Sequence, residues 1–466
     1  MAALSLDDTI AAVATPLGEG GIGIVKISGP QAIPILRRLF VPAVPPPQAS
    51  PEHFLEARRL TLGHVRDAQT GQRVDEVLAV VMPAPHSYTC QDVVEIQAHG
   101  GILAVQRILQ LALAAGARLA EPGEMTLRAF VNGRLDLAQA EAVLDVVQAR
   151  TEAALRVAVE QLGGNLSANV RQVRAGLVDV LAYLEASIDF VEDEIPEQDV
   201  ATPLGQAAAR LQELLASADR GIIYRQGVRA AIVGQPNVGK SSLLNALLGG
   251  DRAIVTPIPG TTRDTLEESV NIQGIPLVLV DTAGIRQQAE GEVERIGIAR
   301  SQAALARADI ALLVVDGTQP PDEADRAIAD LIGNKPAILV VNKCDLPGYS
   351  VSPAASALLP AAPCISLSAL TGEGIEQLEK AIAAMLLGGS VWASDLPLVS
   401  NPRHKACLGR ALEHVQSAER GYLDGLTFDL VAIDVREAID ALGEITGETA
   451  GQELLEAIFS RFCIGK

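Results

Sequence analysis

One short glycine-rich segment limits what this chain can fold into more than any other feature. Gly234-Gln-Pro-Asn-Val-Gly-Lys-Ser241 follows an apolar run, Val228–Val233, and precedes a helical pattern, Leu243–Leu248. Such a loop between a strand and a helix can turn its backbone N–H groups inward and cradle phosphate at the positive end of the helix dipole. The pattern predicts a phosphate-binding loop in which Lys240 binds the β and γ phosphates and Ser241 ligates Mg²⁺.

Two switch-like motifs follow in the order that a nucleotide-binding domain requires. Gly260-Thr-Thr-Arg-Asp264 can supply a threonine, Thr262, that completes the Mg²⁺ shell. The apolar run Leu277–Val280 ends in Asp281-Thr-Ala-Gly284, where the aspartate would orient a metal-bound water and the glycine would report the γ-phosphate. The second motif stands where a parallel strand is expected to end, which is where ligands bind in α/β sheets.

The next two motifs indicate which base is bound. The apolar run Ile338–Val341 ends in Asn342-Lys-Cys-Asp345, and Ser366-Leu-Ser-Ala369 follows. A carboxylate at Asp345 can accept both the N1–H and the exocyclic amine of guanine, a pattern that adenine cannot offer. We therefore predict a Ras-like α/β P-loop GTPase domain. The residues expected to contact GTP are Asn237, Val238, Gly239, Lys240, Ser241, Ser242, Thr256, Pro257, Ile258, Pro259, Gly260, Thr261, Thr262, Asp281, Thr282, Ala283, Gly284, Asn342, Lys343, Asp345, Ser368 and Ala369.

The catalytic groups are less clear from the residues alone. Hydrolysis needs a positioned water and stabilisation of developing charge. Ile285 stands where a Ras-type enzyme offers a glutamine, and no arginine finger is evident. Arg263 and Arg286 are candidates, although each is better interpreted as a mobile switch residue. These motifs therefore leave both catalytic roles open.

A second glycine pattern is not interpreted as a nucleotide site. Gly18-Glu-Gly20-Gly-Ile-Gly23 satisfies G-x-G-x-x-G, but it leads into Ile24–Ile27, which is a strand pattern. The dinucleotide fingerprint needs a helix N-terminus at that place. We predict a glycine-rich turn and no FAD or NAD site in this chain.

Composition restricts the possible partners. The chain has 37 Lys+Arg and 57 Asp+Glu, so its formal charge is 37 − 57 = −20. This balance argues against a protein that coats nucleic acid nonspecifically, because phosphate neutralisation needs clustered cations. Any RNA contact must come from a local patch or from a partner. The five scattered cysteines and the absence of a signal-peptide pattern or long apolar run predict a cytoplasmic protein with free thiols and no membrane span.

The spacing of apolar residues and turns changes along the chain, and these changes predict a multidomain α+β architecture. Residues 1–130 alternate apolar runs and turns, with strands expected at Ile22–Ile27 and Val77–Val81 and a helix at Ile102–Ala115. We interpret 131–222 and 389–466 as two parts of one all-helical bundle, interrupted by an inserted G domain at 223–388. Helical spacing predicts one apolar stripe formed by Leu162, Leu166, Val170, Val173, Leu177, Val180, Leu184 and Ile188, and a second formed by Val431, Val435, Ala438, Leu442 and Ile445.

Several motifs together resemble one family. They are Asn237 in the loop, Gly-Thr-Thr-Arg-Asp, Asp-Thr-Ala-Gly, Glu292-Val-Glu-Arg-Ile-Gly-Ile298 and the terminal Phe462-Cys-Ile-Gly-Lys466. Ala14-Thr-Pro16, Gly20-Gly-Ile-Gly23, Pro122-Gly-Glu124 and Arg134-Leu-Asp-Leu-Ala-Gln-Ala-Glu141 extend the match to the N-terminal part. The chain resembles the MnmE (TrmE) family of tRNA modification GTPases over its full length.

The resemblance implies answers to the catalytic questions. In that family K⁺ takes the place of an arginine finger, and the positions that hold it match Asn237, Thr256, Ile258 and Thr261. The water-positioning acid of the family matches Glu294, and Lys240 is also expected to be catalytic. The family hydrolyses GTP when two G domains meet, so a homodimer through the N-terminal domains is implied.

The resemblance also implies a tetrahydrofolate site in the N-terminal domain, for a 5,10-methylene or 5-formyl derivative. By motif, the contacts fall on Lys26, Glu95, Arg134 and Lys466. The family pattern has arginine at the first position and lysine at the third, and these two cations are not equivalent in geometry. The alternative for Lys26 and Arg134 is solvated surface charge. Cys463 stands between cations that favour a reactive thiolate, so a chemical role and a structural role are both open.

The implied reaction adds a carboxymethylaminomethyl or aminomethyl group to carbon 5 of the tRNA wobble uridine. The implied partner is the flavoprotein MnmG, which would carry FAD and NADH, in a heterotetramer. Two alternatives remain at this point: a ribosome-assembly GTPase of the Era or Der type, and a non-catalytic GTP-dependent switch. The first should carry a basic RNA-binding appendage, whereas the C-terminal helical pattern here is acidic.

Overall fold

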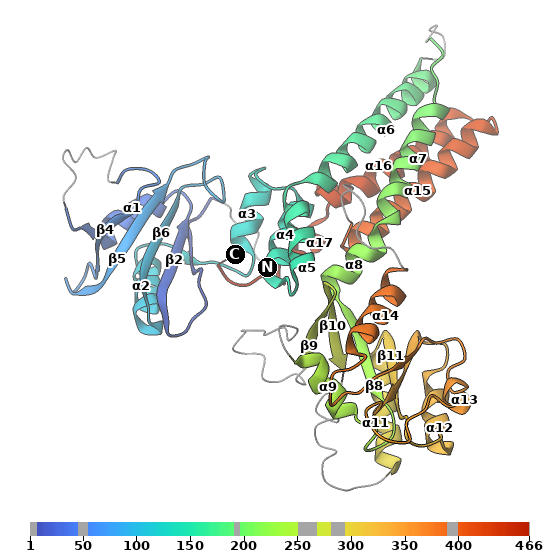
Figure 1. The fold of residues 1–466 in the computed structure, drawn as a ribbon. Coiled ribbons are helices and arrows are strands. Elements are labelled where there is room, and N and C mark those ends of the chain that lie inside the picture. Colours follow the sequence, from blue (N-terminus) through green and yellow to red (C-terminus); the bar gives the residue numbers. More distant parts are fainter. Residues whose placement is uncertain are drawn as a thin grey trace. The chain divides into compact units, whose positions relative to one another are not determined.

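A computed structural model describes residues 7–44, 55–190, 196–249, 268–280, 294–388 and 399–465. The chain forms two compact units (Figure 1). The N-terminal unit comprises Met1–Leu144 and Gly443–Lys466, and the second unit comprises Asp145–Leu442. The last residues therefore fold with the first ones, whereas the sequence pattern grouped 389–466 as one helical segment.

The N-terminal unit is built on a seven-stranded sheet with the order β3-β4-β5-β6-β2-β1-β7. The pairs are antiparallel except for β1 with β7, which is parallel. The expected strands at Ile22–Ile27 and Val77–Val81 and the helix at Ile102–Ala115 are confirmed. The elements are β1 (Ile10–Val13), β2 (Gly20–Ser28), α1 (Ala32–Leu39), β3 (Phe40–Pro42), β4 (Thr61–Arg66), β5 (Arg73–Met82), β6 (Val93–Gly100), α2 (Ile102–Ala114) and β7 (Arg118–Leu119).

The core of this sheet lies under two helices. Ile35 of α1 and Ile108 of α2 are buried with alternate strand residues such as Val25, Ile27 and Ile96. Successive side chains of a strand point to opposite faces, so one face can be apolar while the other carries charge. The glycine-rich segment that mimics a dinucleotide fingerprint leads into a strand and not a helix, but the predicted turn is shorter than expected, since Gly20 to Gly23 already belong to β2.

The described part of the N-terminal unit also contains α3 (Glu124–Val131), α4 (Leu137–Gln148), which runs on into the second unit, and α17 (Gln452–Phe459). A small core joins Leu137 of α4 to Phe459 and Phe462 from the end of the chain. Gly123, at φ +71°, lets the chain pass so close that an added Cβ would lie 2.5 Å from the carbonyl oxygen of Phe459. A glycine is needed there because both the backbone conformation and the space exclude a side chain.

A cluster of charges, two of them buried, joins α3 to the residues just before β1 and to β7. The guanidinium of Arg128 is fully buried and lies 2.8 Å from a carboxylate oxygen of Glu124, which is also buried. Arg118 donates to the same oxygen at 2.7 Å, and Arg128 also donates to the carbonyl of Asp8 at 2.8 Å. Burial alone would raise the pKa of Glu124, but the bonds from Arg118, Glu121 and Arg128 hold it below its usual range.

The second unit contains the helical segments that flank the inserted domain. They are α5 (Glu152–Leu162), α6 (Asn165–Asp189), α7 (Ala201–Ala216), α8 (Ala218–Gln226), α15 (Pro402–Leu423) and α16 (Phe428–Thr446). Figure 1 shows α6, α7, α15 and α16 running alongside one another, and α15 packs along α7. The expected C-terminal stripe is confirmed, since all its members are buried on α16.

The expected stripe around α6 is wrong at both ends. Leu162 is the last residue of α5, and Gly163 and Gly164 separate it from α6, with Gly164 at φ +84°. Ile188 is exposed near the end of α6. The spacing of apolar residues continues across the two glycines, but α5 ends before them. A new helix, α6, begins after Gly164, whose left-handed backbone conformation interrupts the helix.

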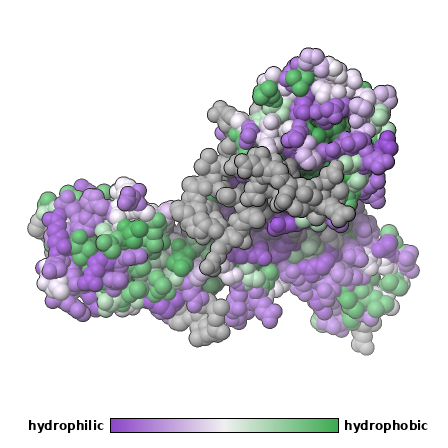
Figure 2. Space-filling model, turned by 90° about the horizontal axis from the view of Figure 1, so that it is seen from below, coloured by the Kyte–Doolittle hydropathy of each residue, from purple (hydrophilic) through white to green (hydrophobic). Residues whose placement is uncertain are grey.

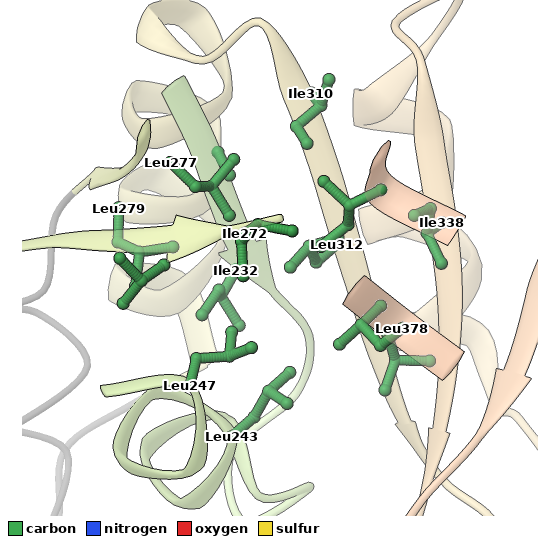
Figure 3. Packing of buried hydrophobic residues seen from close by; sticks show 14 of the residues in the cluster. Ile232, Leu243, Leu247, Ile272, Leu277, Leu279, Ile310, Leu312, Ile338 and Leu378 are labelled. Atoms are coloured by element: carbon green, nitrogen blue, oxygen red, sulfur yellow. The ribbon is translucent and has the colours of Figure 1, made fainter. Parts of the chain in front are cut away.

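The inserted domain has a six-stranded sheet with the order β13-β12-β11-β8-β10-β9, parallel except for β9. Apolar cores lie on both faces, and Figure 3 shows the one in which Leu243 and Leu378 from helices meet Leu312 and Ile338. The elements are β8 (Val228–Val233), α9 (Lys240–Leu248), β9 (Glu268–Ile272), β10 (Ile275–Val280), α11 (Glu294–Arg307), β11 (Ile310–Asp316), α12 (Glu323–Ile332), β12 (Ala337–Asn342), α13 (Pro353–Ser356), β13 (Cys364–Ser366) and α14 (Ile375–Leu387).

The helical part of the second unit contacts the turn between β9 and β10. The hydroxyl of Thr151, which caps α5 by accepting from Ala154, donates to the carbonyl of Gly274 at 2.8 Å. Arg150 donates to the hydroxyl of Ser269 on β9 at 3.1 Å. This turn joins the two strands that border the expected switch segments, so α5 is tied to the hairpin between them.

The outer surface carries some apolar side chains. Figure 2 shows apolar residues among hydrophilic ones on the N-terminal unit, at the left of that view. On the sheet, Leu62 of β4 and Leu78 of β5 are cross-strand partners and are 50% and 37% exposed. Within the described ranges, no helix combines the length and the apolar character that crossing a membrane requires.

Candidate functional site

The phosphate loop adopts the backbone that the motif predicts. Gly234, directly after β8, has φ +150°, and an added Cβ would lie 2.2 Å from the carbonyl oxygen of Val314. Gly239, at φ +101°, stands before α9, and its Cβ would meet the side-chain amide of Asn342 at 2.1 Å. Both positions require glycine because neighbouring groups occupy the space. Asn237 is exposed at φ +63°, in the left-handed region that asparagine tolerates.

Lys240 is held inside this loop at the start of α9. Its Nζ donates to the carbonyl oxygens of Gly234 at 2.9 Å and Gln235 at 2.5 Å. Burial lowers the pKa of Lys240 to about 8, because the charged form loses water. A buried ammonium at a helix N-terminus favours an anionic ligand, and a phosphate there would restore its charge.

Two hydroxyls follow the lysine in the first turn of α9. Ser241 and Ser242 are both exposed. A hydroxyl oxygen beside the phosphate-binding lysine is a donor that suits Mg²⁺, which prefers oxygen ligands and keeps waters and substrate phosphates in its shell. In the described part of the chain, no group of three or more His, Cys, Asp or Glu residues is arranged to hold a metal on its own.

The guanine motifs meet the phosphate loop through one buried amide. Asn342, 3% exposed at the end of β12, donates from Nδ2 to the carbonyl of Val238 at 2.7 Å. Its Oδ1 accepts from the backbone N–H of Ala369 at 3.0 Å. Asn342 therefore joins the phosphate loop to the loop of Ser368, which is itself buried, whereas Asp345 is exposed.

Two contacts around this site are not apparent from the motifs. Lys343, at φ +71°, lies 2.5 Å from Asp316 at the end of β11. Burial alone would raise the pKa of Asp316, but the hydrogen bonds from Lys343 and Thr318 hold this pKa below its usual range. Gln235 donates to Asp322, the N-cap of α12, at 2.5 Å. An aspartate directly after the apolar run of β11 was the available sequence signal for the first contact.

The structure does not place the remaining predicted nucleotide and K⁺ residues. Glu294 is the first residue of α11, but its side chain lies outside the described residues. Asp281 follows the described end of β10. The other positions outside the described residues are Thr256, Pro257, Ile258, Pro259, Gly260, Thr261, Thr262, Thr282, Ala283 and Gly284.

A second candidate site lies on the N-terminal sheet. Lys26 of β2 and Glu95 of β6 are direct cross-strand partners, and Lys26 Nζ lies 3.4 Å from a carboxylate oxygen of Glu95. Both side chains are about one-fifth exposed, at 18% and 22%. A partly buried pair of opposite charges across an antiparallel ladder places an anion-binding and a donor-binding group side by side.

Arg134 joins this pair through an aromatic ring that the sequence analysis missed. Its guanidinium carbon lies 4.7 Å from the ring centroid of Tyr88, and Lys26 Nζ lies 5.7 Å from the same centroid. Arg134 also donates to the carbonyl of Tyr88 at 3.4 Å. Only 3% of the residues are aromatic, so a tyrosine in a turn-rich segment was the sequence signal that could have identified Tyr88 as part of the site.

The end of the chain lies beside the same sheet. The carbonyl of Cys463 accepts from the N–H of Gly123 at 3.4 Å, and the thiol residue is exposed. Gly465, at φ +95°, approaches β1 so closely that a Cβ would lie 2.3 Å from the carbonyl oxygen of Val13. Val13 pairs with Val25, the neighbour of Lys26. Lys466 follows Gly465 but lies outside the described residues.

Comparisons with known proteins cover nearly the whole chain. The model of the GTP-binding protein TrmE N-terminus matches residues 9–134, and that of the MnmE helical domain matches residues 137–463. A tRNA modification GTPase MnmE from Roseiflexus castenholzii is 54% identical over 99% of both chains. The protein of that name from Chloroflexus aurantiacus is 53% identical over 99% of this chain and 100% of its own.

A solved structure is also similar. The match to the G domain of the T. maritima FeoB iron transporter covers 34% of this chain and 98% of that domain, at 28% identity and a TM-score of 0.26. The family model of the helical domain spans more than half of the chain, and the MnmE relatives match end to end. The chain belongs to the MnmE family of tRNA modification GTPases.

Proposed function

We propose that this chain is a Mg²⁺-dependent, K⁺-stimulated GTPase that modifies tRNA. With the flavoprotein MnmG it would add a carboxymethylaminomethyl or aminomethyl group to carbon 5 of the wobble uridine. The observation that carries the GTPase proposal is the phosphate loop, in which Lys240 is buried at a helix N-terminus and Val238 is tied to the guanine motif by Asn342. The tRNA substrate is supported by the names of the full-length relatives.

In the nucleotide site, Lys240 would bind the β and γ phosphates, and Ser241 with Thr262 would hold Mg²⁺. The exposed Ser241 hydroxyl beside the loop lysine fits that ion. Bound Mg²⁺ supplies charge neutralisation on the phosphates. Asp345 would accept the N1–H and amine of guanine, and Asn342 would hold the surrounding loops. The other sequence-predicted contacts keep their proposed roles.

A K⁺ ion would be held by Asn237 and by Thr256, Ile258 and Thr261. The left-handed Asn237 fits this role because its side chain is exposed at the loop surface, where an ion could reach it. Bound K⁺ supplies positive charge where an arginine finger would otherwise act. Glu294 would orient the attacking water.

The N-terminal site would bind a tetrahydrofolate derivative through Lys26, Glu95, Arg134 and Lys466, in the 5,10-methylene or 5-formyl form. The donor set fits such a ligand, because two cations suit its carboxylates and Glu95 can accept from the N–H groups of its heterocycle. The folate supplies the one-carbon unit when bound. Cys463, in the same unit, would act in the modification chemistry.

We also propose how the chain is organised and assembled. The segment 1–130 would bind folate and form the homodimer, and 223–388 would form the G domain. The segments 131–222 and 389–466 would form the helical domain, although its terminal residues 443–466 pack with the N-terminal unit. The exposed cross-strand pair Leu62 and Leu78 supports an interface on the N-terminal sheet. MnmG, carrying FAD and NADH, would complete a heterotetramer. The five free cysteines support a cytoplasmic location.

The K⁺ assignment predicts a large salt effect. GTP hydrolysis should be about 100-fold faster in KCl than in NaCl at equal ionic strength, because the cation replaces an oxyanion-stabilising group. Asn237→Ala should remove the difference, while Glu294→Ala should slow hydrolysis in both salts and leave GTP binding intact. Equal rates of the wild type in the two salts would refute the cation site.

The tRNA assignment is tested in cells. Nucleoside mass spectrometry of total tRNA from cells lacking the gene should show loss of the modified wobble uridine, restored by the wild type. Complementation with Cys463→Ser would separate a chemical from a structural role of that thiol. A normal modification profile in the deletion strain would overturn the tRNA proposal, and ribosome profiles would then test the assembly-GTPase alternative.

A further inference from the structure

The two cations of the N-terminal site share one aromatic neighbour. Lys26 is paired with Glu95, so its charge is matched by a carboxylate. Arg134 is exposed, and among the described residues its recorded partners are the ring and the carbonyl of Tyr88, with no carboxylate in reach. A long exposed arginine without such a partner would sample many rotamers, which costs binding free energy when a ligand fixes one of them.

We propose that Tyr88 is the residue that positions Arg134 to receive the acidic end of the ligand. The ring face attracts the guanidinium by a cation–π interaction at 4.7 Å, and the Tyr88 carbonyl fixes its orientation by a hydrogen bond. The inference rests on the proposed folate function, since it assigns the ligand's anionic group to the cation that the ring holds.

The ring itself is well fixed. Its hydroxyl lies 2.9 Å from the hydroxyl of Thr126, which is fully buried on α3. The ring packs against a small core that includes Ile10 and Met125. The next residue, Thr89, is buried and hydrogen-bonds Ser28 at 2.7 Å, which anchors the segment to β2. A ring held from three sides can define where a flexible side chain lies.

The electrostatics agree with this role. Burial raises the pKa of Tyr88 above its usual range, so the phenol stays neutral at physiological pH. The ring therefore acts on cations through its quadrupole and does not pair with them as a phenolate. Arg134 keeps its full charge for a carboxylate of the ligand, which can form a bidentate pair with a guanidinium.

The first experiment compares two variants of the full-length protein in binding 5-formyl-tetrahydrofolate by calorimetry. Tyr88→Leu removes the ring and should weaken binding by roughly 3- to 30-fold. Tyr88→Phe keeps the ring and should bind within about 2-fold of the wild type. The affinity for GTP, whose candidate site is in the second unit, should be the same in the wild type and in both variants. Wild-type-like binding by Tyr88→Leu would overturn the proposal.

A double-mutant cycle separates positioning from direct contact. If the ring acts through Arg134, Tyr88→Leu combined with Arg134→Met should bind no more weakly than Arg134→Met alone. Fully additive losses would show that the ring contacts the ligand independently, and would overturn the positioning role.

A ligand-free readout keeps this inference distinguishable from the folate proposal. Modification of Arg134 by phenylglyoxal, followed by peptide mass spectrometry, should be several-fold faster in Tyr88→Leu and unchanged in Tyr88→Phe. Arg73, which pairs with Glu76 on β5, is the internal control. Unchanged modification of Arg134 in Tyr88→Leu would refute the positioning role. Absence of folate binding by the wild type, with the modification effect present, would refute only the folate proposal.

Discussion

The two β-sheets of this protein place their candidate sites in different ways. In the parallel sheet of the inserted domain, the site lies in loops that directly follow strands, as Gly234 follows β8 and Asn342 ends β12. In the antiparallel sheet of the N-terminal unit, the site lies on the sheet itself, where Lys26 and Glu95 face each other across two strands. Parallel strands gather their carboxyl ends at one edge, whereas antiparallel strands do not.

The interiors differ in the same sense. The parallel sheet is covered on both faces by apolar cores. The N-terminal unit has an apolar core too, but it also buries an ion pair, Arg128 with Glu124. Buried ion pairs contribute little net stability when intact but cost much when one partner is lost. The comparison predicts that removal of a buried charge destabilises the N-terminal unit. In the inserted domain, by contrast, a side chain added where the backbone is closely approached should disturb the site.

The largest effect should come from Arg128→Met. The variant leaves Glu124 buried with a weakened set of partners, so the free energy of unfolding of the N-terminal unit should fall by about 3–5 kcal/mol. Amide hydrogen exchange in β1 and α3 would measure it, with exchange in β8 and β12 unchanged. Arg118→Met is the matched control, since Arg118 bonds the same carboxylate but is 39% exposed. Equal losses in the two variants would contradict the role of burial.

Gly239→Ala tests the inserted domain. The new Cβ would meet the amide of Asn342 and hold a strained φ, so GTP should bind about 100-fold more weakly. Titration with a fluorescent GTP analogue would measure the change. Gly333→Ala is the control, because Gly333 also has a positive φ but faces open space. Similar affinities for the two variants would mean that the close approach to Asn342 does not matter.

The pH dependence of GTP binding should reflect Lys240. The free protein loses the lysine proton above pH 8, and the bound phosphate favours the protonated form, so affinity falls as pH rises and binding takes up a proton. GTP should bind about tenfold more weakly at pH 9 than at pH 7. Lys240→Arg, whose guanidinium stays charged, should give a weaker but flat profile over this range. A flat wild-type profile would exclude the buried lysine as its source.

The most local effect concerns the contact between α5 and the β9–β10 turn. Thr151→Val removes both the helix cap and the bond to Gly274, so local stability should fall by about 1–2 kcal/mol. Hydrogen exchange at the turn would detect it. Ser352→Ala removes a comparable cap on α13 and should leave the turn unchanged. If the turn is equally protected from hydrogen exchange in both variants, the Thr151 hydrogen bond does not tie the turn to α5.

This contrast explains how much of each candidate site could be predicted from the sequence. Each nucleotide motif is a contiguous segment after an apolar run, so local reasoning located Lys240 and Asn342 and the strands that carry them. The N-terminal site joins residues as distant as Lys26, Glu95 and Arg134, and only family resemblance named them. Nothing local connected Tyr88 to those cations, because the contact depends on strand register and on the turn before Arg134.

The ionic cluster was missed for the same reason. Arg128 and Glu124 are four residues apart on α3, a spacing that is common on exposed helices. Their burial depends on tertiary contacts, such as those of Arg128 with Asp8 and Gln91, which lie far away in the sequence. The error at Leu162 is different: the periodicity was real, but Gly163 and Gly164 end one helix and begin another.

The return of the chain to its starting unit has a consequence for synthesis on the ribosome. The core that joins Leu137 to Phe459 and Phe462 needs residues that are made last. Residues 145–442 lie between the two parts of the N-terminal unit, which is 442 − 144 = 298 residues. At about 5–20 residues per second, the first part waits roughly 15–60 seconds for its final helix. During that interval the surface that α17 later covers on α3 and α4 is exposed, and a truncated chain would never bury it.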